Sequence, residues 1–214
     1  MNKETFKNIT FEEIYLIHKR NLKYLEVRNE RRTALCFSGV PGAGKTTISK
    51  QLEKELKAIR IEIDEIRDIV SKIFEQKNLE FRDNEDKYLK IKNQSYKYLE
   101  QLLKYLHKNK KNSLIILDFS LDRRYFYVQS LLDNLNYKIF SISIEADEEQ
   151  LRERIKTRDS GMLDHSIYLK MLPNWINDHS VFNSQHKLDI YINTNKLTIE
   201  ESTSEILQQF RAIK

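Results

Sequence analysis

The chain has 214 residues, a length that suits one α/β domain or at most two small ones, and its formal charge is +5. Its single cysteine excludes an internal disulfide and favours a reducing compartment, so we expect a cytoplasmic protein. No apolar run is long enough to span a membrane and no apolar signal opens the chain, which argues against a membrane protein. The basic balance suits a phosphate-rich substrate, nucleic acid included, and equally a lysine-rich surface.

The first predicted element is a helix that begins near Thr10. The tetrapeptide TFEE at positions 10–13 has the form of a capping box, and apolar residues then recur at helical spacing as far as Leu25. His18 lies on this apolar stripe, where a packed side chain is a better interpretation than a ligand. We therefore expect residues 1–32 to form an N-terminal helical extension that precedes the main domain, residues 33–214.

The stretch from Ala34 to Lys57 organises the rest of the chain. Residues 34–38 are typical of a buried strand, and residues 48–56 of a helix with one apolar face. Between them stands GVPGAGKTT, which matches the phosphate-binding pattern G-x-x-x-x-G-K-[ST] in the strand–loop–helix context that the pattern requires. Its residues are Gly39, Val40, Pro41, Gly42, Ala43, Gly44, Lys45, Thr46 and Thr47.

This pattern fits the binding of a polyphosphate. Glycine lets the backbone approach the phosphate oxygens, and three of the four glycines of the chain stand here. The N-terminus of the following helix adds unpaired N–H groups and the positive end of the helix dipole. Lys45 would place a charge between the β- and γ-phosphates of ATP, and Thr46 would offer a hydroxyl to Mg²⁺.

The rest of the chain alternates predicted strands with predicted helices. The expected strands are residues 59–63, 113–118, 137–144 and 188–192. The expected helices are residues 64–75, 84–109, 122–136, 147–158 and 166–179, the last kinked or interrupted at Pro173, and one that begins at Thr198. The alternation predicts an α/β fold with three layers, a mainly parallel five-stranded sheet with helices on both faces.

Two acids follow predicted strands, and ligands of such sheets bind at the carboxyl ends of the strands. Asp118 ends a strongly apolar strand, where it could hold Mg²⁺ through water or position an acceptor hydroxyl; a turn or helix-cap role is the alternative. Asp64 ends the neighbouring strand and could accept a hydroxyl proton; a helix cap is again the alternative. Arg67 could pair with Asp64 or Asp68, or bind an anionic group of the acceptor.

Three arginines, Arg152, Arg154 and Arg158, precede a polar stretch at 159–164 that is typical of a loop. Arg154 and Arg158 are four residues apart, so they share one face of the predicted helix. On a lid, their charges would neutralise a phosphoryl group in transfer, whereas the alternative is a solvated basic face.

The order of these motifs resembles that of the P-loop kinases of small molecules and of polynucleotide 5′ ends, an AAA-type group with zeta-toxin-like and polynucleotide-kinase-like members. The resemblance covers residues 33–214 and rests on residues 39–47, Asp64-x-x-Arg67, Asp118 and Arg154-x-x-x-Arg158. It implies the P-loop NTPase fold, with Asp64 as the base, Arg67 on an acceptor phosphate, and the two lid arginines on the donor phosphates. The stretch DIYINT at 189–194 resembles the last strand and the adenine-side loop of these kinases.

The acceptor side departs from this pattern. Phe119 and Ser120 follow Asp118, whereas many relatives have Thr or Asn soon after this acid. Phe119, Tyr125 and Tyr127 could stack on a base or a sugar, although such aromatic residues more often belong to a core.

We therefore expect an ATP- and Mg²⁺-dependent phosphotransferase that moves the γ-phosphate to a hydroxyl. Asp64 would be the base, Lys45 with Arg154 or Arg158 the phosphate clamp, and Thr46 with Asp118 the metal-binding pair, while Asp64, Arg67 and Asp118 would contact the acceptor. The sequence does not choose among four acceptors: a polynucleotide 5′ end, a nucleoside, a sugar and an antibiotic. Two other classes also stay open: an ATPase or switch with a protein partner, and a nucleic-acid-binding module with structural ATP.

Overall fold

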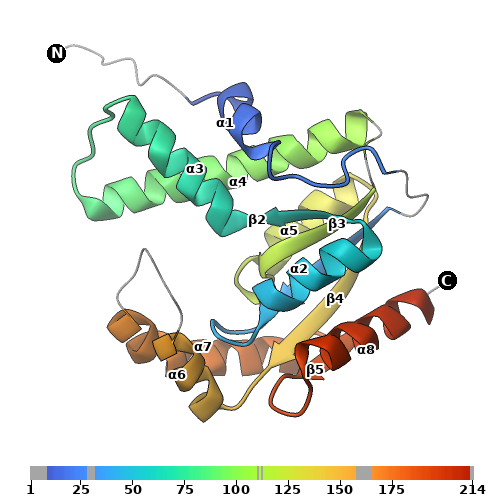
Figure 1. Cartoon of the computed structure of the whole chain (residues 1–214). Helices are drawn as coiled ribbons and strands as arrows, with labels where there is room; N and C mark the ends of the chain where they lie inside the picture. Colours follow the sequence, from blue (N-terminus) through green and yellow to red (C-terminus); the bar gives the residue numbers. More distant parts are fainter. Residues whose placement is uncertain (1–8, 28–31, 110, 112, 158–164, 213–214) are drawn as a thin grey trace.

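A computed structural model gives the fold and describes residues 9–27, 32–109, 111, 113–157 and 165–212. Five strands form one parallel sheet in the order β2-β3-β1-β4-β5 (Figure 1). The strands are β1 (Thr33–Ser38), β2 (Ile59–Glu62), β3 (Leu114–Ser120), β4 (Lys138–Glu145) and β5 (Ile190–Asn193). The predicted α/β fold with a parallel sheet is therefore confirmed.

Helices lie on both faces of this sheet. They are α1 (Phe11–His18), α2 (Lys45–Leu56), α3 (Ile63–Gln76), α4 (Asn84–Lys108), the short 3₁₀ helix η1 (Asp122–Arg124), α5 (Tyr125–Asn134), α6 (Glu148–Thr157), α7 (His165–Gln185) and α8 (Ile199–Ala212). The central strand β1 is buried along its whole length, because its alternate residues enter two different cores. Ala34 and Cys36 pack with residues of α3, α4 and α5, whereas Leu35 and Phe37 pack with residues of α2 and α8.

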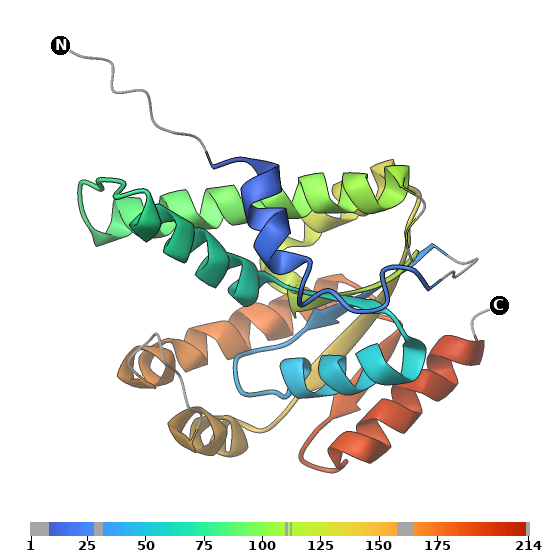
Figure 2. The same ribbon diagram turned by 45° about the horizontal axis from the view of Figure 1, so that its top comes forward.

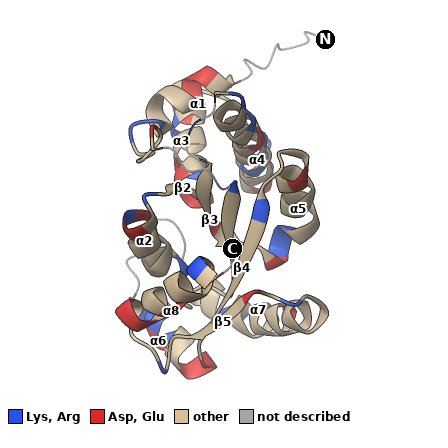
Figure 3. Ribbon diagram, turned by 90° about the vertical axis from the view of Figure 1, so that its right-hand side faces the viewer, with Lys and Arg blue, Asp and Glu red and all other residues tan. Residues whose placement is uncertain are grey.

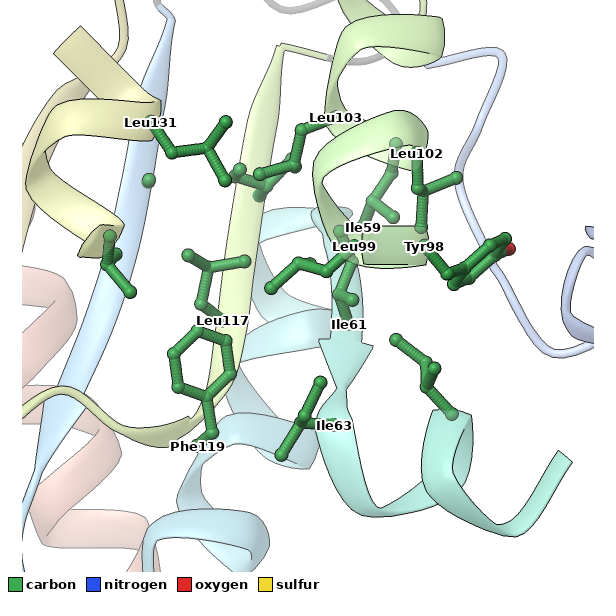
Figure 4. Packing of buried hydrophobic residues seen from close by; sticks show 14 of the residues in the cluster. Ile59, Ile61, Ile63, Tyr98, Leu99, Leu102, Leu103, Leu117, Phe119 and Leu131 are labelled. Atoms are coloured by element: carbon green, nitrogen blue, oxygen red, sulfur yellow. The ribbon is translucent and has the colours of Figure 1, made fainter. Parts of the chain in front are cut away.

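The first of these cores lies between α4 and the strands β2 and β3 (Figure 4). Leu99 and Leu102 of α4 are fully buried and lie in the same cluster as Ile61 of β2 and Leu117 of β3. Burial of one such side chain contributes about 1.5–3 kcal/mol, so apolar area holds this side of the sheet. Phe119, near the end of β3, is 8% exposed and belongs to this core. This agrees with the interpretation that such aromatic residues more often belong to a core than stack on a ligand.

Helix α1 packs across α3 and α4 (Figure 2). Its capping box is present, because the Thr10 hydroxyl accepts from the Glu13 backbone N–H and the Glu13 carboxylate accepts from the Thr10 backbone N–H. Ile14 is fully buried, and the Phe11 ring stacks 5.4 Å from the ring of Tyr98 on α4. The division of the chain at residue 33 stays a prediction, while the buried residues of this segment share one core with the sheet.

Several predicted boundaries are shifted; β3, for example, continues past Asp118 to Ser120. β2 ends at Glu62 and α3 begins at Ile63, one residue earlier than predicted, so Asp64 lies in the first turn of a helix and not at the end of a strand. The apolar alternation of Ile59, Ile61 and Ile63 misleads here, because Ile63 is buried from its place in the helix. Helix α7 continues to Gln185 and is not interrupted at Pro173, since buried residues hold it to the core on both sides of the proline.

The described helices include none that is long and apolar enough to cross a membrane. Their outer faces carry charges of both signs, and Figure 3 shows blue and red segments interleaved on α2 and α4. Several of these charges form pairs along one helix, such as Lys104 with Glu100 and Lys156 with Glu153. Such exposed pairs contribute little to stability, so the packing of the two cores is the main source of it.

His18 at the end of α1 is a fully buried titratable group. Its ring is 0% exposed, its Nδ1 lies 3.0 Å from the Tyr98 hydroxyl, and its Nε2 lies 3.8 Å from a carboxylate oxygen of Glu65. Burial lowers the pKa of His18 to about 4, because the protonated ring would lose its hydration. Burial also raises the pKa of the Glu65 carboxyl. The interpretation of His18 as a packed residue agrees with this placement.

We expect this histidine to make the fold sensitive to acid. In the unfolded chain its pKa returns to about 6.5, so the unfolded state binds the proton first and stability falls as the pH drops from 6.5 towards 4. Between pH 7 and pH 5 the free energy of unfolding should fall by about 2 kcal/mol more in the wild type than in His18→Gln. Urea unfolding of both proteins at the two pH values measures this difference, and equal losses would contradict it.

Candidate active site

The loop from Gly39 to Gly44 joins β1 to α2 and brings the backbone close to neighbouring segments. Gly39 has φ +140°, and a Cβ there would lie 2.4 Å from the carbonyl oxygen of Ile144 in β4. Gly44 has φ +105° and stands at the N-cap of α2 in the left-handed region. Both positions require glycine, so the loop keeps the tight path that turns backbone N–H groups and the start of α2 towards one point.

Lys45 extends into the curve of this loop. Its Nζ donates to the carbonyl oxygen of Gly39 at 2.6 Å and to that of Val40 at 2.9 Å. Ser120 at the end of β3 also donates to the Gly39 carbonyl, which ties the loop to the neighbouring strand. The ammonium therefore stands beside the helix N-terminus, where it adds a full charge to the dipole and suits an anionic ligand.

Asp118 lies beside the first turn of α2, as the sequence predicted. It lies within β3, its side chain is 3% exposed, and the cap of η1 is Leu121, so the helix-cap alternative is wrong. Its Oδ1 accepts from the Thr46 hydroxyl at 3.2 Å, and its Oδ2 accepts from the Ser49 hydroxyl at 2.7 Å. The pair of Thr46 and Asp118 thus joins a hydroxyl to a carboxylate at the edge of the phosphate loop.

This donor set fits Mg²⁺. Hydroxyl and carboxylate oxygens are the hard ligands that Mg²⁺ prefers, and the ion commonly uses one or two carboxylates together with substrate phosphates and waters. Within the described part of the chain, no group of three or more His, Cys, Asp or Glu side chains could hold a metal. A metal here would therefore depend on Thr46, Asp118 and phosphate oxygens together.

A half-buried arginine that sequence reasoning missed stands next to Asp118. Arg60 NH1 donates at 2.7 Å to Asp118 Oδ2 and at 2.7 Å to Glu62 Oε2. Burial disfavours the charged guanidinium, but the hydrogen bonds and charges of the two carboxylates outweigh burial and raise the pKa of Arg60. The signal was present in β2, where Arg60 and Glu62 alternate with buried isoleucines and so share the opposite face of the strand.

Asp64 and Arg67 face each other at the start of α3. Arg67 NH1 donates to Asp64 Oδ1 at 2.7 Å, and the Asp64 side chain is 66% exposed. The N-cap of α3 is Glu62, so Asp64 does not cap the helix. Of the alternatives for Arg67, pairing with Asp64 is the one observed, and the exposed carboxylate keeps its other oxygen for a further ligand.

Arg154 of α6 is held by the phosphate loop and by the residue that follows β5. Its guanidinium donates to the Thr194 hydroxyl at 2.8 Å, to the Thr194 carbonyl at 3.0 Å, and to the Gly42 carbonyl at 3.3 Å. This is a fixed position rather than a solvated face. Arg152 instead pairs with Glu148 on its own helix. Arg158, which we also predicted for the lid, lies outside the described residues.

One cavity of about 930 Å³ joins these groups. It is lined by the phosphate loop with Lys45 and Thr46, by Asp64 and Arg67 from α3, by Asp118 from β3, and by Arg154 and Thr194. Among the lining residues that sequence reasoning missed are Tyr96 of α4, Arg123 of η1 and Tyr168 of α7. They come from segments far apart in the chain, and no local pattern marks them.

Aromatic rings support the arginines at one end of this cavity. The Arg123 guanidinium lies 4.7 Å from the centre of the Trp175 ring, and that of Arg124 lies 4.8 Å from the centre of the Tyr96 ring. Of the three aromatic residues that we considered for stacking, Phe119 lines the cavity, while Tyr125 packs against the first core and Tyr127 lies edge-on to Tyr96. Cation–π contacts of this kind contribute about 0.5–2 kcal/mol and hold a guanidinium in place.

Comparisons with known proteins agree with this geometry. A family model described as an AAA domain matches residues 35–165, more than half of the chain and the part that holds the phosphate loop, Asp64 and Asp118. A search of curated proteins found no match.

Solved structures share the fold. Shikimate kinase from Bacteroides thetaiotaomicron has 13% identity and a TM-score of 0.56, with 84% of this chain and 98% of that chain covered. A structure from the PezAT chromosomal toxin-antitoxin system of Streptococcus pneumoniae has 21% identity and a TM-score of 0.59, with 86% and 78% covered. The Mycobacterium tuberculosis APS kinase, in complex with AMPPNP and APS, has 12% identity and a TM-score of 0.52, with 86% and 99% covered. At these identities the likeness shows the fold alone.

Proposed function

Because the chain belongs to the AAA domain family, whose model matches residues 35–165, and has the fold of the P-loop kinases, we propose that it moves the γ-phosphate of ATP to a hydroxyl acceptor. One observation carries the proposal: Lys45, the Thr46–Asp118 pair and the exposed carboxylate of Asp64 line the same cavity. A phosphate-binding loop without an acid opposite it would suit a binding protein or a switch. With an exposed carboxylate in the same cavity, it suits transfer to a hydroxyl.

The donor side is formed by the loop, α2 and Arg154. The backbone N–H groups and the helix N-terminus would bind the phosphates, and Lys45 would leave its two carbonyl partners to contact the γ-phosphate. When bound, ATP with Mg²⁺ would supply the phosphoryl group and neutralise its charge. Thr46 and Asp118 would hold the ion, and Arg154 would add a fixed cation beside Gly42.

The acceptor side begins at Asp64. Its carboxylate would take the hydroxyl proton as the acceptor oxygen bonds to the γ-phosphorus and the bond between that phosphorus and the leaving oxygen of ADP breaks. Arg67 holds the carboxylate from one side, which orients it for this step. Tyr96 and Arg123 line the same cavity and are available to contact the acceptor.

The size of the cavity favours a compact acceptor. At about 930 Å³ it is near the upper end of the range for small-molecule sites, which leaves room for a nucleotide and one further small group. A nucleoside, a sugar, an antibiotic or the terminal residue of a polynucleotide fits this description. The basic side chains Arg67 and Arg123 favour an acceptor that carries a negative charge.

A matched acceptor panel tests the proposal. The protein is incubated with Mg²⁺ and ATP labelled at the γ-phosphorus, together with hydroxyl compounds of each class and a partner compound that lacks the hydroxyl. We expect label to enter one hydroxyl compound and not its partner, for example a 5′-hydroxyl oligonucleotide but not the 5′-phosphorylated form. Label that appears in inorganic phosphate alone would contradict the proposal and support an ATPase or switch. Salt-dependent binding of nucleic acid without turnover would support the binding module.

A further inference from the structure

Arg60 is the centre of a partly buried group of three charges next to the site. It reaches from β2 between two carboxylates, and one guanidinium nitrogen lies 2.7 Å from an oxygen of each. The side chains are 12% exposed for Arg60, 23% for Glu62 and 3% for Asp118. Charges that are sheltered from water interact more strongly than exposed ion pairs do. These three side chains should therefore have a strong effect on the electrostatic potential around Asp118.

The register of the sheet brings the two carboxylates together. β2 pairs with β3 so that Glu62 stands directly opposite Asp118. Like charges in such a cross-strand position repel each other and destabilise the sheet unless a cation separates them. Arg60 lies two residues before Glu62 on the same face of β2, and its nitrogen takes the place between the two oxygens that a bridging cation would take.

The remaining hydrogen bonds of Asp118 leave little room for another ligand. Its Oδ2 accepts from both Ser49 and Arg60, and its Oδ1 accepts from Thr46. A carboxylate has about four lone-pair positions, so the free position lies on Oδ1 beside the Thr46 hydroxyl. Asp118 and Glu62 carry two negative charges and Arg60 one positive charge, which leaves a single net negative charge for a divalent ion.

We propose that Arg60 acts as a built-in cation between Asp118 and Glu62, so that a divalent ion binds beside Thr46 only together with the phosphates of the nucleotide. This inference rests on the proposed function, because it concerns the metal that the phosphotransfer would use. Arg60 is then a positioning residue: it fixes Asp118 for the metal and removes the charge that would otherwise bind a metal alone. The phosphates supply the missing negative charge when the nucleotide arrives.

A purely structural ion pair would behave differently. If Arg60 only joined β2 to β3, its loss would lower stability and leave the affinity for metal unchanged. If it replaces a cation, removal of its charge exposes two close carboxylates, and these should bind a divalent ion without nucleotide. The readout that separates the two roles is therefore metal binding by the nucleotide-free protein, measured apart from any turnover.

The experiment is a titration of nucleotide-free protein with Mn²⁺, followed by the loss of the free-ion signal in electron paramagnetic resonance. Arg60→Gln removes the charge and keeps donors for both carboxylates, while Arg60→Met keeps only the stem. We expect weak Mn²⁺ binding by the wild type and binding about ten-fold tighter or more in both variants, since one unit charge at such a distance is worth more than this factor. Lys97→Met removes one exposed charge from α4 and should match the wild type.

Further variants locate the site. Adding Glu62→Gln to Arg60→Gln should return Mn²⁺ affinity to the wild-type value, because one carboxylate of the pair is then neutral. The inference would be overturned if Arg60→Gln and the wild type bound Mn²⁺ with the same affinity in the absence of nucleotide. If Arg60→Met does not fold, the comparison of Arg60→Gln with the wild type still tests the inference. Absence of phosphate transfer would contradict the proposed function but would leave the Mn²⁺ comparison intact, so the two failures are distinguishable.

Discussion

Lys45→Ala is expected to abolish transfer of phosphate while the fold stays intact. The ammonium stands inside the phosphate loop, 2.6 and 2.9 Å from two loop carbonyls, and contributes nothing to the apolar cores. Its loss removes a full charge at the phosphate position, and donors of this kind contribute about 10²–10³-fold to the rate. The Gly39 carbonyl keeps the hydrogen bond that Ser120 donates, and one lost hydrogen bond costs about 1 kcal/mol, so the protein should still fold.

The measurement is the initial rate of transfer from labelled ATP, with thermal unfolding recorded on the same preparations. Lys54→Ala is the matched control, because Lys54 is an exposed lysine of the same helix that does not line the cavity. We expect the control to keep the wild-type rate. A Lys45→Ala protein that folds and turns over at the wild-type rate would overturn the assignment of the phosphate site.

Asp64→Asn is expected to keep the affinity for ATP and to lose transfer by about 10²–10⁴-fold, the usual contribution of a general base. Asparagine has nearly the same shape and can still accept from Arg67, but it takes no proton at neutral pH. Because Asp64 lies in the first turn of α3 and does not cap it, the cost to stability should be about 0.3–1 kcal/mol from the helix dipole. Burst and steady-state rates with the best acceptor of the panel, together with ATP binding, measure these effects.

Glu75→Gln serves as the control for Asp64→Asn. Glu75 lies at the far end of the same helix, is 62% exposed, and does not line the cavity. The substitution removes one negative charge and should leave the rate unchanged. If Asp64→Asn retains transfer and instead loses several kcal/mol of stability, Asp64 has a structural role and a different group must take the proton.

The phosphate loop could be predicted in full because its signal is local. Glycine positions, the lysine and the hydroxyl residues follow one another in nine residues. The structure places the glycines between β1 and α2, and α2 begins at Lys45, earlier than predicted. Asp118 was also predictable, since an acid at the end of an apolar strand reaches the first turn of α2 in a parallel sheet. Both inferences depend on short-range patterns and one rule of topology.

The partners of Asp118 could not be predicted in the same way. Arg60 meets Asp118 because β2 and β3 pair in one particular register, and Ser49 meets it because α2 crosses the edge of β3. No local sequence pattern predicts the register of the two strands or the position of α2 relative to β3. The charged alternation of β2 indicated only that Arg60 and Glu62 share a face, not that Arg60 stands between Glu62 and a third charge, Asp118.

The surroundings of two other candidate residues differ from what the sequence alone indicates. Asp64 was expected at the junction of a strand and a helix, and the helix begins one residue before it, so its carboxylate lies in the first turn of α3. Arg154 was expected on a lid, but it is held by Gly42 and Thr194, which are far away in the sequence. Its role at the donor phosphates stays a prediction, as does that of Arg158, which lies outside the described residues.

The most direct test of phosphotransfer to a hydroxyl is the chemical fate of the γ-phosphorus, followed by ³¹P nuclear magnetic resonance with ATP, Mg²⁺ and the pooled acceptor panel. The proposed function predicts a new phosphomonoester signal that grows with the ADP signals in the wild type and is lost in Asp64→Asn. A γ-phosphorus that appears only as inorganic phosphate, at the same rate in both proteins, would contradict it.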